Sequence, residues 1–596
     1  MRRRILPLLP LLLAVMLLAS ACSNAPLASV CADDSGHSVA RRWNEQLLDA
    51  IRRDTPSPTV HARNLFHVSA AMWDAWAAYD EGATALFVDA PKRDIGPERD
   101  VTVAYAAYTV LGRRYRNSVG GTESLAAFDA ELSAQCLEPV SDDIGDAALL
   151  GVDIGETILE QFRNDGAFEF DAYVDLSYVP VNESLVVAEP GAGMIDPDRW
   201  QPLELAKSVT QNDQEQVSGT QQFLGPQWGT VVPFALEPSD VGLPVDPGPP
   251  PLFAEDPAAY ADAAIEVLRY QQTLDTAEAG LVDVSPATLG NNPLGSNDGS
   301  GHASNPATGE PYEPNLVSQA DFGRVVAEFW ADGPNSETPP GHWNTLANEV
   351  SDDIAEYRFR GEGPAMDRLE WDLKLYLTLN GAMHDAAIAA WGSKRYFDSA
   401  RPISMIRQLA EMGQSTDPNR ARYHPDGLPL IDDEIELVTE ASAADYQLAP
   451  GTIAVRAWAG HPELHADRDG VTWIDATTWV PYQLSTFVTP SFPGYVSGHS
   501  AFSRAGAEVM TAFTGDAYFP NGMGRFTAPA AWLRFDDGPA EHVTLEWATY
   551  ADAADQAGES RMYGGIHISA DDIAGRFIGA ECGQLAVAKA FALFQS

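Results

Sequence analysis

The sequence is short of basic residues, of cysteine and of long apolar segments. It holds 37 lysines and arginines against 85 aspartates and glutamates, which gives a net charge of −48 at pH 7. Such an excess of negative charge argues against nucleic acid or anionic lipid as a partner. Beyond the N-terminal region, no apolar stretch is long enough to cross a bilayer. The length of 596 residues nevertheless allows the cores of two or three domains.

The four cysteines set narrow limits on disulfide bonding. If Cys22 is set aside, Cys31, Cys136 and Cys582 remain. In an oxidising compartment they permit at most one disulfide and leave one free thiol. The sequence does not decide which two of them pair.

The N-terminus has the pattern of an export signal. Three arginines at 2–4 precede an apolar run over 5–18, and small residues then lead to Cys22. We therefore predict a signal peptide over residues 1–22 and a periplasmic or extracellular location. The end of this segment resembles a bacterial lipobox, which favours a lipid anchor on Cys22. Ordinary cleavage after Ala21 is the alternative.

Most of the remaining chain has the apolar spacing of packed helices. Between about 165 and 315 the character changes to loops rich in proline and glycine, with one helix expected near 257–278. Elsewhere apolar residues recur every three to four positions. Helices are predicted over 38–52, 61–80, 99–115, 124–135 and 144–163, within 318–413, and over 500–514 and 541–558.

Two helical segments echo each other along the chain. The sequence Ala-Ala-Met-Trp-Asp-Ala at 70–75 aligns with Gly-Ala-Met-His-Asp-Ala at 381–386, and a Trp-Asn pair precedes each copy. This repetition predicts an all-α fold of duplicated helical bundles about a pseudo-twofold axis. The alternative is that alanine-rich helices look alike by composition. We expect an N-terminal bundle over 23–164, a loop-rich insertion over 165–317 and a catalytic bundle over 318–596.

Three short blocks carry polar chemistry, all in the C-terminal half. In the first, Lys394 and Arg401 would lie two turns apart on one helix face if the helix continued. The second places Ser497, Gly498 and His499 at a helix N-terminus, where free N–H groups and the helix dipole favour an anion. The third contains Arg561, His567 and Asp571.

Each block alone has a structural explanation, as a solvated helix face, an N-cap or a core histidine. Together they offer one lysine, two arginines, a hydroxyl, a backbone N–H and two histidines to a single small oxyanion. A chain with so few basic residues has little structural reason to gather three cations beside histidines. We therefore predict a buried pocket for a phosphate-shaped anion.

The order and spacing of these residues resemble a known signature. Lys-x6-Arg-Pro, Ser-Gly-His and Ser-Arg-x5-His, spread over 391–571, resemble the motif of vanadium-dependent haloperoxidases and of acid phosphatases in the phosphatidic acid phosphatase type 2 superfamily. Val496 departs from it, because the motif usually has proline before Ser-Gly-His. Looser similarity to bacterial haloperoxidases extends over most of the chain, and the resemblance implies a mainly helical fold.

The resemblance also implies a role for each residue. Vanadate, or phosphate in its place, would be held by Lys394, Arg401, Ser497, Gly498 and Arg561, with His567 as the vanadium ligand. The resemblance further implies His499 as the acid–base group, Trp391 and Phe492 around the halide, and Asp571 and Asp332 as supporting acids. The expected partners are hydrogen peroxide, a halide and a small organic acceptor, and the product is hypohalous acid or a halogenated compound.

Two other functions stay open at this point. An acid phosphatase would use the same residues, with His567 forming a phosphohistidine and His499 protonating the leaving alcohol. A lipoprotein that only binds an oxyanion is the non-enzymatic alternative. The length of the chain and the aromatic residues Trp391 and Phe492 favour the haloperoxidase. The segment Pro-Pro-Gly-His ending at His342 resembles the anion-binding turn but lacks its serine.

Overall fold

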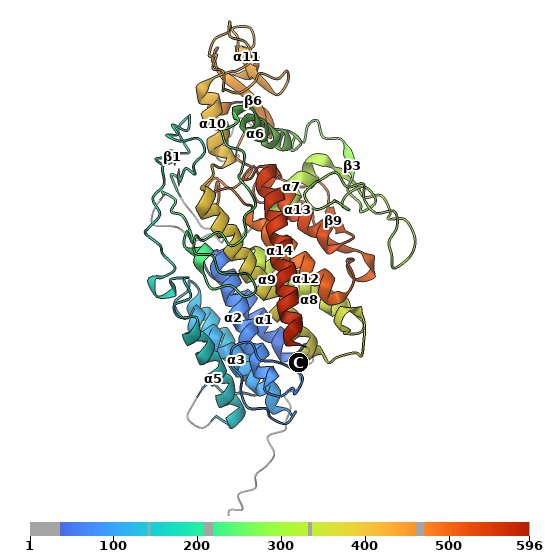
Figure 1. Cartoon of the computed structure of the whole chain (residues 1–596). Helices are drawn as coiled ribbons and strands as arrows, with labels where there is room; N and C mark the ends of the chain where they lie inside the picture. The colour runs from blue at the N-terminus through green and yellow to red at the C-terminus, as the bar shows by residue number, and fades with distance from the viewer. Residues whose placement is uncertain (1–35, 141–143, 208–218, 332–335, 461–469, 595–596) are drawn as a thin grey trace, which may run out of the picture.

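The fold is mainly helical, as a computed structural model of residues 36–140, 144–207, 219–331, 336–460 and 470–594 shows. The all-α prediction is confirmed. An N-terminal group of helices, blue to teal in Figure 1, matches the predicted segments to within a few residues. It consists of α1 (Val39–Arg53), α2 (Pro58–Ala77), α3 (Glu98–Tyr115), α4 (Gly121–Ala134) and α5 (Asp146–Gln161).

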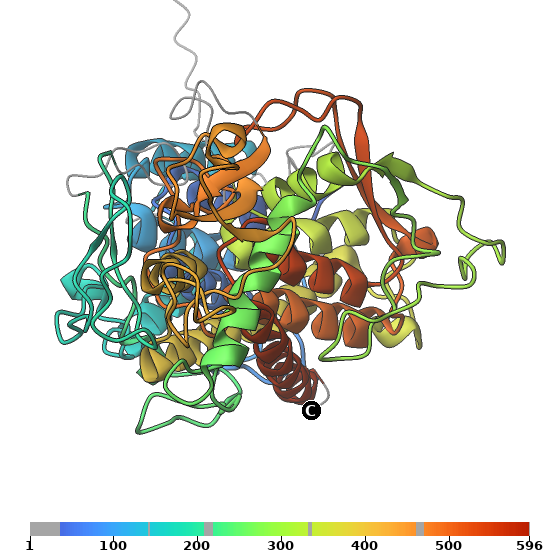
Figure 2. The same ribbon diagram turned by 90° about the horizontal axis from the view of Figure 1, so that it is seen from above.

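The C-terminal helices pack beside this first group (Figures 1 and 2). Helix α9 is the central element, because it contacts α2 of the first group as well as α12 and α14 of its own. Its middle is buried on all sides, as expected for a helix inside a bundle. The C-terminal helices are α7 (Gln319–Phe329), α8 (Thr338–Asp353), α9 (Arg368–Phe397), α10 (Pro402–Met412), α11 (Ala443–Tyr446), α12 (Gly498–Thr514), α13 (Tyr550–Tyr563) and α14 (Ser569–Leu593).

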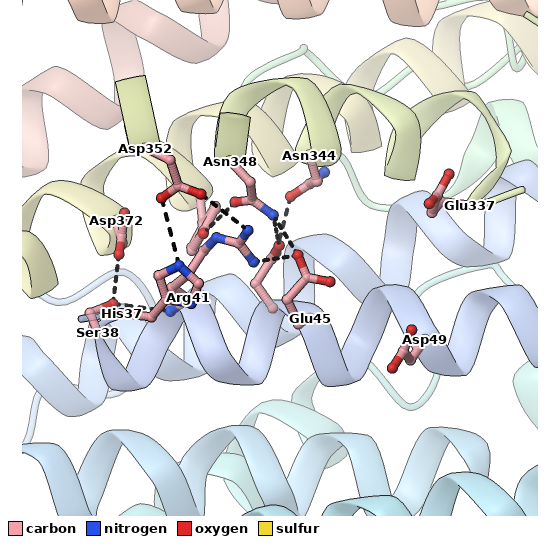
Figure 3. Close-up of polar contacts among 12 residues, drawn as sticks. His37, Ser38, Arg41, Glu45, Asp49, Glu337, Asn344, Asn348, Asp352 and Asp372 are labelled. Atoms are coloured by element: carbon pink, nitrogen blue, oxygen red, sulfur yellow. Dashed lines mark hydrogen bonds and ion pairs between the residues drawn. The ribbon is translucent and has the colours of Figure 1, made fainter. Parts of the chain in front are cut away.

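Residues that match in the sequence repeat contact each other across the two groups. The Asn44 amide donates to the Asn344 oxygen at 3.1 Å, and both belong to the paired Trp-Asn motifs. Asn380 donates to Ser69 at 2.9 Å, and these two residues hold equivalent positions in the aligned helices. Equivalent residues meet in this way only near a symmetry axis, so these contacts support the pseudo-twofold arrangement. Figure 3 shows the polar side chains of α1 facing those of α8 in the same region.

The loop-rich insertion is not isolated from the bundles. Its helix α6 (Pro257–Gln272) packs against β6 and α10, and together they enclose a second apolar core. The insertion also contributes β1 (Leu185–Val186), β2 (Leu203–Glu204), β3 (Leu281–Asp283) and β4 (Leu316–Ser318). The antiparallel sheet of this core is formed by β5 (Ile435–Leu437), β6 (Ile453–Trp458) and β7 (Val471–Asp475). The domain boundaries given above stay a prediction.

One predicted helix is partly wrong. Residues 541–558 were expected to be helical throughout, but β9 (Val543–Trp547) pairs with β8 (Gly524–Ala528) before α13 begins at Tyr550. The segment from Val543 to Trp547 alternates buried and partly exposed residues, which is the period of a strand and not of a helix. The long helix α14 was not among the predicted segments.

Several sequence predictions concern residues outside the described part. The signal peptide over 1–22, Cys22, Cys31 and Asp332 all lie there. Cys136 takes part in a disulfide, whereas Cys582 is a free, buried thiol, so these two do not pair with each other. Within the described ranges, no helix has both the length and the apolar character of a membrane span.

Candidate functional site

The end of α9 places the first two predicted site residues by a route that the sequence did not predict. Lys394 lies in the last turn of α9, which ends at Phe397, and Asp398 then adopts a left-handed conformation with φ of 52°. Arg401 is the N-cap residue of the next helix, α10. The helix therefore does not continue from Lys394 to Arg401, so the condition for placing both residues on one helix face is not met. A sharp turn brings the two side chains together instead.

Both cations are buried and bonded to neutral acceptors. The Lys394 ammonium donates to the carbonyls of Pro493 and Gly494, each at 2.8 Å. Arg401 donates to the carbonyls of Phe492 at 2.8 Å and Ile566 at 2.7 Å. Its Nη2 has no hydrogen-bond partner among the described residues. These carbonyls satisfy most of the donors but carry no negative charge, so they do not neutralise the two cations.

The second block forms the expected helix N-terminus. Ser497 is the N-cap of α12, and its hydroxyl accepts the Ser500 N–H at 3.3 Å. Gly498 is the first residue of the helix, so its N–H is not used by the helix itself. A Cβ at Gly498 would lie 3.2 Å from the Trp391 ring, so glycine allows this close approach.

The third block is held by one carboxylate. Asp571, in the first turn of α14, accepts the His567 Nδ1–H at 2.8 Å and the Ile568 N–H at 3.3 Å. Its backbone carbonyl accepts the Ser497 N–H at 2.9 Å. The histidine therefore presents Nε2 on its other edge, where Arg401 Nη1 lies 3.5 Å away. Asp571 links the turn before α12, the start of α14 and the histidine.

The electrostatic interactions show that all these groups converge. Burial holds the pKa of His567 well below its ordinary value, and the charges of Arg401, Lys394 and Arg561 act in the same direction. Burial and the Arg401 charge also lower the pKa of Lys394. Burial raises the pKa of Asp571 to about 7, against the opposing effect of the two cations. A bound anion would lower the cost of these buried positive charges.

His499 lines the same cavity as His567, and one of its ring nitrogens contacts a backbone carbonyl. Its Nε2 lies 2.8 Å from the Trp330 carbonyl. Because a carbonyl only accepts, Nε2 carries the hydrogen and Nδ1 is the basic nitrogen of the neutral ring. Burial, followed by the nearby Arg561 charge, holds the pKa of His499 well below its ordinary value.

A cavity of about 50 Å³ opens onto the two histidines. Trp391 and Phe492 form one wall, with ring centroids 4.8 Å apart, and the Lys394 ammonium lies 4.9 Å from the Phe492 ring. The remaining wall includes residues that sequence reasoning missed, namely Pro58, Leu224, Pro339, Phe487 and Phe502.

The residues that were missed differ in whether a sequence pattern could have indicated them. Phe502 lies three residues after His499 on α12, so helical spacing could have indicated it. Pro58 and Leu224 come from distant segments and give no local signal. His342, set aside above for want of a serine, lines a small cavity together with His499. Of the predicted site residues, Asp332 lies outside the described part, and the structure brings the others together.

The donor set fits a tetrahedral oxyanion such as vanadate or phosphate. The cationic side chains of Lys394, Arg401 and Arg561, the unused Gly498 N–H and the unpartnered Arg401 Nη2 can all face negative oxygens. The Nε2 edge of His567 is suited to a bond with the central atom, since Asp571 fixes the hydrogen on Nδ1. The same geometry would suit either vanadate bonded to His567 or a phosphoryl group on His567.

Comparisons with known proteins agree with this fold. Residues 374–596 match the family model of the VCPO second helical-bundle domain. An apo-type bacterial vanadium-dependent chloroperoxidase superposes with a TM-score of 0.61 at 17% identity, covering 90% of this chain and 95% of that one. A holo-type structure of that description gives 0.60 at 16%, covering 91% and 94%. A bacterial vanadium-dependent iodoperoxidase gives 0.53 at 19%, covering 92% and 95%. No curated protein sequence matches the chain.

The family match concerns the C-terminal part of the chain. Residues 374–596 are similar to a VCPO second helical-bundle domain, and every predicted site residue in the described part lies within this matched segment. The chain as a whole has the fold of the bacterial vanadium-dependent haloperoxidases.

Proposed function

We propose that this chain is a vanadate-dependent haloperoxidase. It would combine hydrogen peroxide, a halide ion and a proton to give hypohalous acid and water, or a halogenated product from an organic acceptor. The observation that carries the proposal is the setting of His567. Its Nδ1 is held by Asp571, while Nε2 faces the buried guanidinium of Arg401, which forms no salt bridge with a carboxylate of the described ranges.

The residues that would hold vanadate follow from their donors. Lys394, Arg401 and Arg561 would neutralise its oxygens, Ser497 and the Gly498 N–H would add hydrogen bonds, and His567 would bind vanadium through Nε2. When bound, vanadate would supply the Lewis acidity that activates hydrogen peroxide towards a halide. Asp571 would keep the imidazole in the required orientation and tautomer.

His499 would act as the acid–base group. Its lowered pKa keeps the ring neutral near pH 7, and a neutral imidazole is the form that can accept a proton from hydrogen peroxide. The hydrogen bond from Nε2 to the Trp330 carbonyl fixes the ring for this transfer. The apolar rings of Trp391 and Phe492 beside the Lys394 ammonium suit a weakly hydrated halide.

The location stays a proposal as well. We propose that the protein is exported and that Cys22 carries a lipid anchor. This rests on the residues that precede Cys22 alone.

The test compares two reactions of the same purified protein. One sample receives vanadate, hydrogen peroxide and bromide, and the other a generic phosphomonoester without vanadate. We expect halogenation that depends on vanadate and disappears in His567→Ala. Phosphate release without halogenation would identify a phosphatase instead, and vanadate binding without either reaction would identify a binding protein.

The role of His499 has its own readout. His499→Ala should lower the turnover rate more than the vanadate affinity, because the residue would move a proton and not hold the anion. Equal losses of both would contradict the assignment.

A further inference from the structure

A second, larger cleft adjoins the candidate site. It has a volume of about 410 Å³, which lies within the range of small-molecule sites. Its walls come from the start of α2, the insertion and the end of α9. It shares Pro58, Leu224, Trp391 and Phe492 with the cavity above the two histidines. The Trp391–Phe492 pair therefore forms a wall common to both spaces.

The cleft is rigidly attached to the site. The Trp391 indole donates to the Leu224 carbonyl at 2.8 Å, and the Leu224 N–H donates to the Ser491 carbonyl at 3.0 Å. Gln221 donates to the Thr489 carbonyl at 2.6 Å. On the other wall, the Tyr178 hydroxyl donates to Asp398, just past the end of α9, at 2.8 Å. These bonds tie both walls of the cleft to the segments that carry the site residues.

The lining of the cleft is aromatic and almost uncharged. Among its described lining residues, Asp175 is the one that carries a charge, in a chain with a net charge of −48. The lining includes the aromatic side chains of Tyr173, Trp200, Phe223 and Trp228. An anionic ligand would therefore find no opposite charge among these lining residues, whereas flat apolar molecules would gain from contact with the rings.

The outer rim is apolar and faces solvent. Val174, Leu176 and Val179 are 49%, 84% and 77% exposed and line the cleft. Single exposed apolar residues are ordinary, but a group of them around a cleft marks a binding surface. Their position beside the aromatic walls extends the apolar surface from solvent to Trp391.

We propose that this cleft binds a neutral, apolar organic molecule, an arene in particular, and presents it to the halogenating site. The chemistry rests on the proposed function. Hypohalous acid formed from hydrogen peroxide would transfer its halogen to carbon, a C–H bond would be replaced by a carbon–halogen bond, and the released proton would leave with the oxygen as water. The bound arene would then be halogenated in preference to a diffusible acceptor.

The first experiment measures binding alone. The full-length protein, without vanadate or peroxide, is dialysed to equilibrium against 4-phenylphenol and against the same biphenyl bearing a carboxylate. We expect the neutral compound to bind at least about 10-fold more tightly, because the cleft offers no cation to the carboxylate. In Leu176→Asp/Val179→Asp the dissociation constant for 4-phenylphenol should rise by about 10-fold. Both replaced side chains are exposed, so the fold is preserved.

Ile95→Asp is the matched control. Ile95 is 72% exposed and lies outside the cleft, so 4-phenylphenol binding should be unchanged. Peroxide-dependent iodide oxidation should be equal in the parent and in both variants, since none of these residues contacts the site. In a mixture of 4-phenylphenol and phenol with bromide, the parent should give a higher ratio of halogenated 4-phenylphenol to halogenated phenol than free hypobromous acid gives. The Leu176→Asp/Val179→Asp variant, called the rim variant, should give a ratio close to that of free hypobromous acid.

The outcomes separate the two proposals. Absence of 4-phenylphenol binding in the parent, or binding that the rim variant leaves intact, would overturn the cleft assignment even if halide is oxidised. Binding that the rim variant weakens, in a protein that oxidises no halide, would support the arene site and reject the proposed function. The parent could instead sediment with phosphatidylcholine vesicles, lose this in the rim variant and bind no 4-phenylphenol. That result would make the rim a lipid contact and reject the arene site.

Discussion

Helices α2 and α9 are the two copies of the repeated helix, and they differ in length at their C-terminal ends. In each, a buried aspartate accepts three consecutive backbone N–H groups. Asp74 of α2 accepts those of Leu86, Phe87 and Val88. Asp385 of α9 accepts those of Phe234, Ala235 and Leu236. The shared part of the repeat thus fastens a neighbouring loop to each helix.

The difference lies beyond this shared part. Alignment of the two aspartates matches Ala77, the last residue of α2, with Ile388, and α9 runs nine residues farther, to Phe397. That extension carries Trp391 and Lys394. In the alignment, Lys394 is matched by Ala83 of the N-terminal copy. The repeat is therefore the shared scaffold, and the longer helix carries two of the candidate site residues.

The largest expected loss of activity distinguishes two buried histidines that each lie beside an arginine. His567 faces Arg401, and His67 contacts Arg114 at 2.8 Å in the N-terminal group. His567→Gln should lower vanadate-dependent bromide oxidation by about 10³-fold, because the ligand nitrogen is lost. His67→Gln should keep the turnover rate per folded molecule. Steady-state kinetics on both variants checks this, and a similar loss in both would remove the distinction between the halves.

A smaller effect is expected for the carboxylate that positions His567. Asp571→Asn should weaken vanadate binding by about 10- to 100-fold, since an amide orients the imidazole less well. Equilibrium dialysis with vanadate measures the affinity, and the turnover rate at saturating vanadate should fall less. A lower melting temperature with unchanged affinity would assign Asp571 a structural role, like that of Asp385.

The two equivalent aspartates should affect stability and not chemistry. Burial raises the pKa of Asp385 to about 7 and that of Asp74 to about 6. The folded state therefore keeps a proton that the unfolded chain has already lost, so this contribution to stability falls as pH rises from about 4 towards these values. Asp385→Asn should cost about 1–3 kcal/mol at pH 5, through weaker acceptance of the three N–H groups.

The pH dependence tests the sign of this effect. The stability gap between parent and Asp385→Asn should narrow between pH 5 and pH 8, and that of Asp74→Asn should narrow by about pH 6. Urea unfolding at several pH values measures both. A gap that widens with pH would show that the carboxylates are ionised in the folded protein.

The smallest effect concerns the contact between the halves. Asn44→Ala should destabilise the protein by about 1–2 kcal/mol, because it removes the buried bond that Asn44 donates to Asn344 and the one that it accepts from Asn348. Asn344→Ala should cost more, since Asn344 also bonds to Asn380 and Pro340. Denaturant titration of the single and double variants should give a double-variant cost below the sum. Strict additivity would mean that this contact does not couple the halves.

Local patterns in the sequence were enough to place most helices and to choose the site residues. Apolar spacing located α1 to α6 and α12 within a few residues, and the three motifs named the groups that converge around His567. Patterns failed where a helix had to stop. Lys394 and Arg401 are joined by the turn at Asp398, and 543–547 form a strand, because packing against neighbours outweighs local preference there.

The sequence by itself determined which side chains this protein has for an oxyanion, and in what order, because side-chain chemistry and helix periodicity are local properties. The tertiary structure alone decided that Arg401 and Lys394 share one buried space with His567, and that Pro58 and Leu224 join Trp391 in a cleft beside it. Burial and mutual electrostatic effects depend on contacts between distant segments, so they arise only when the chain has folded.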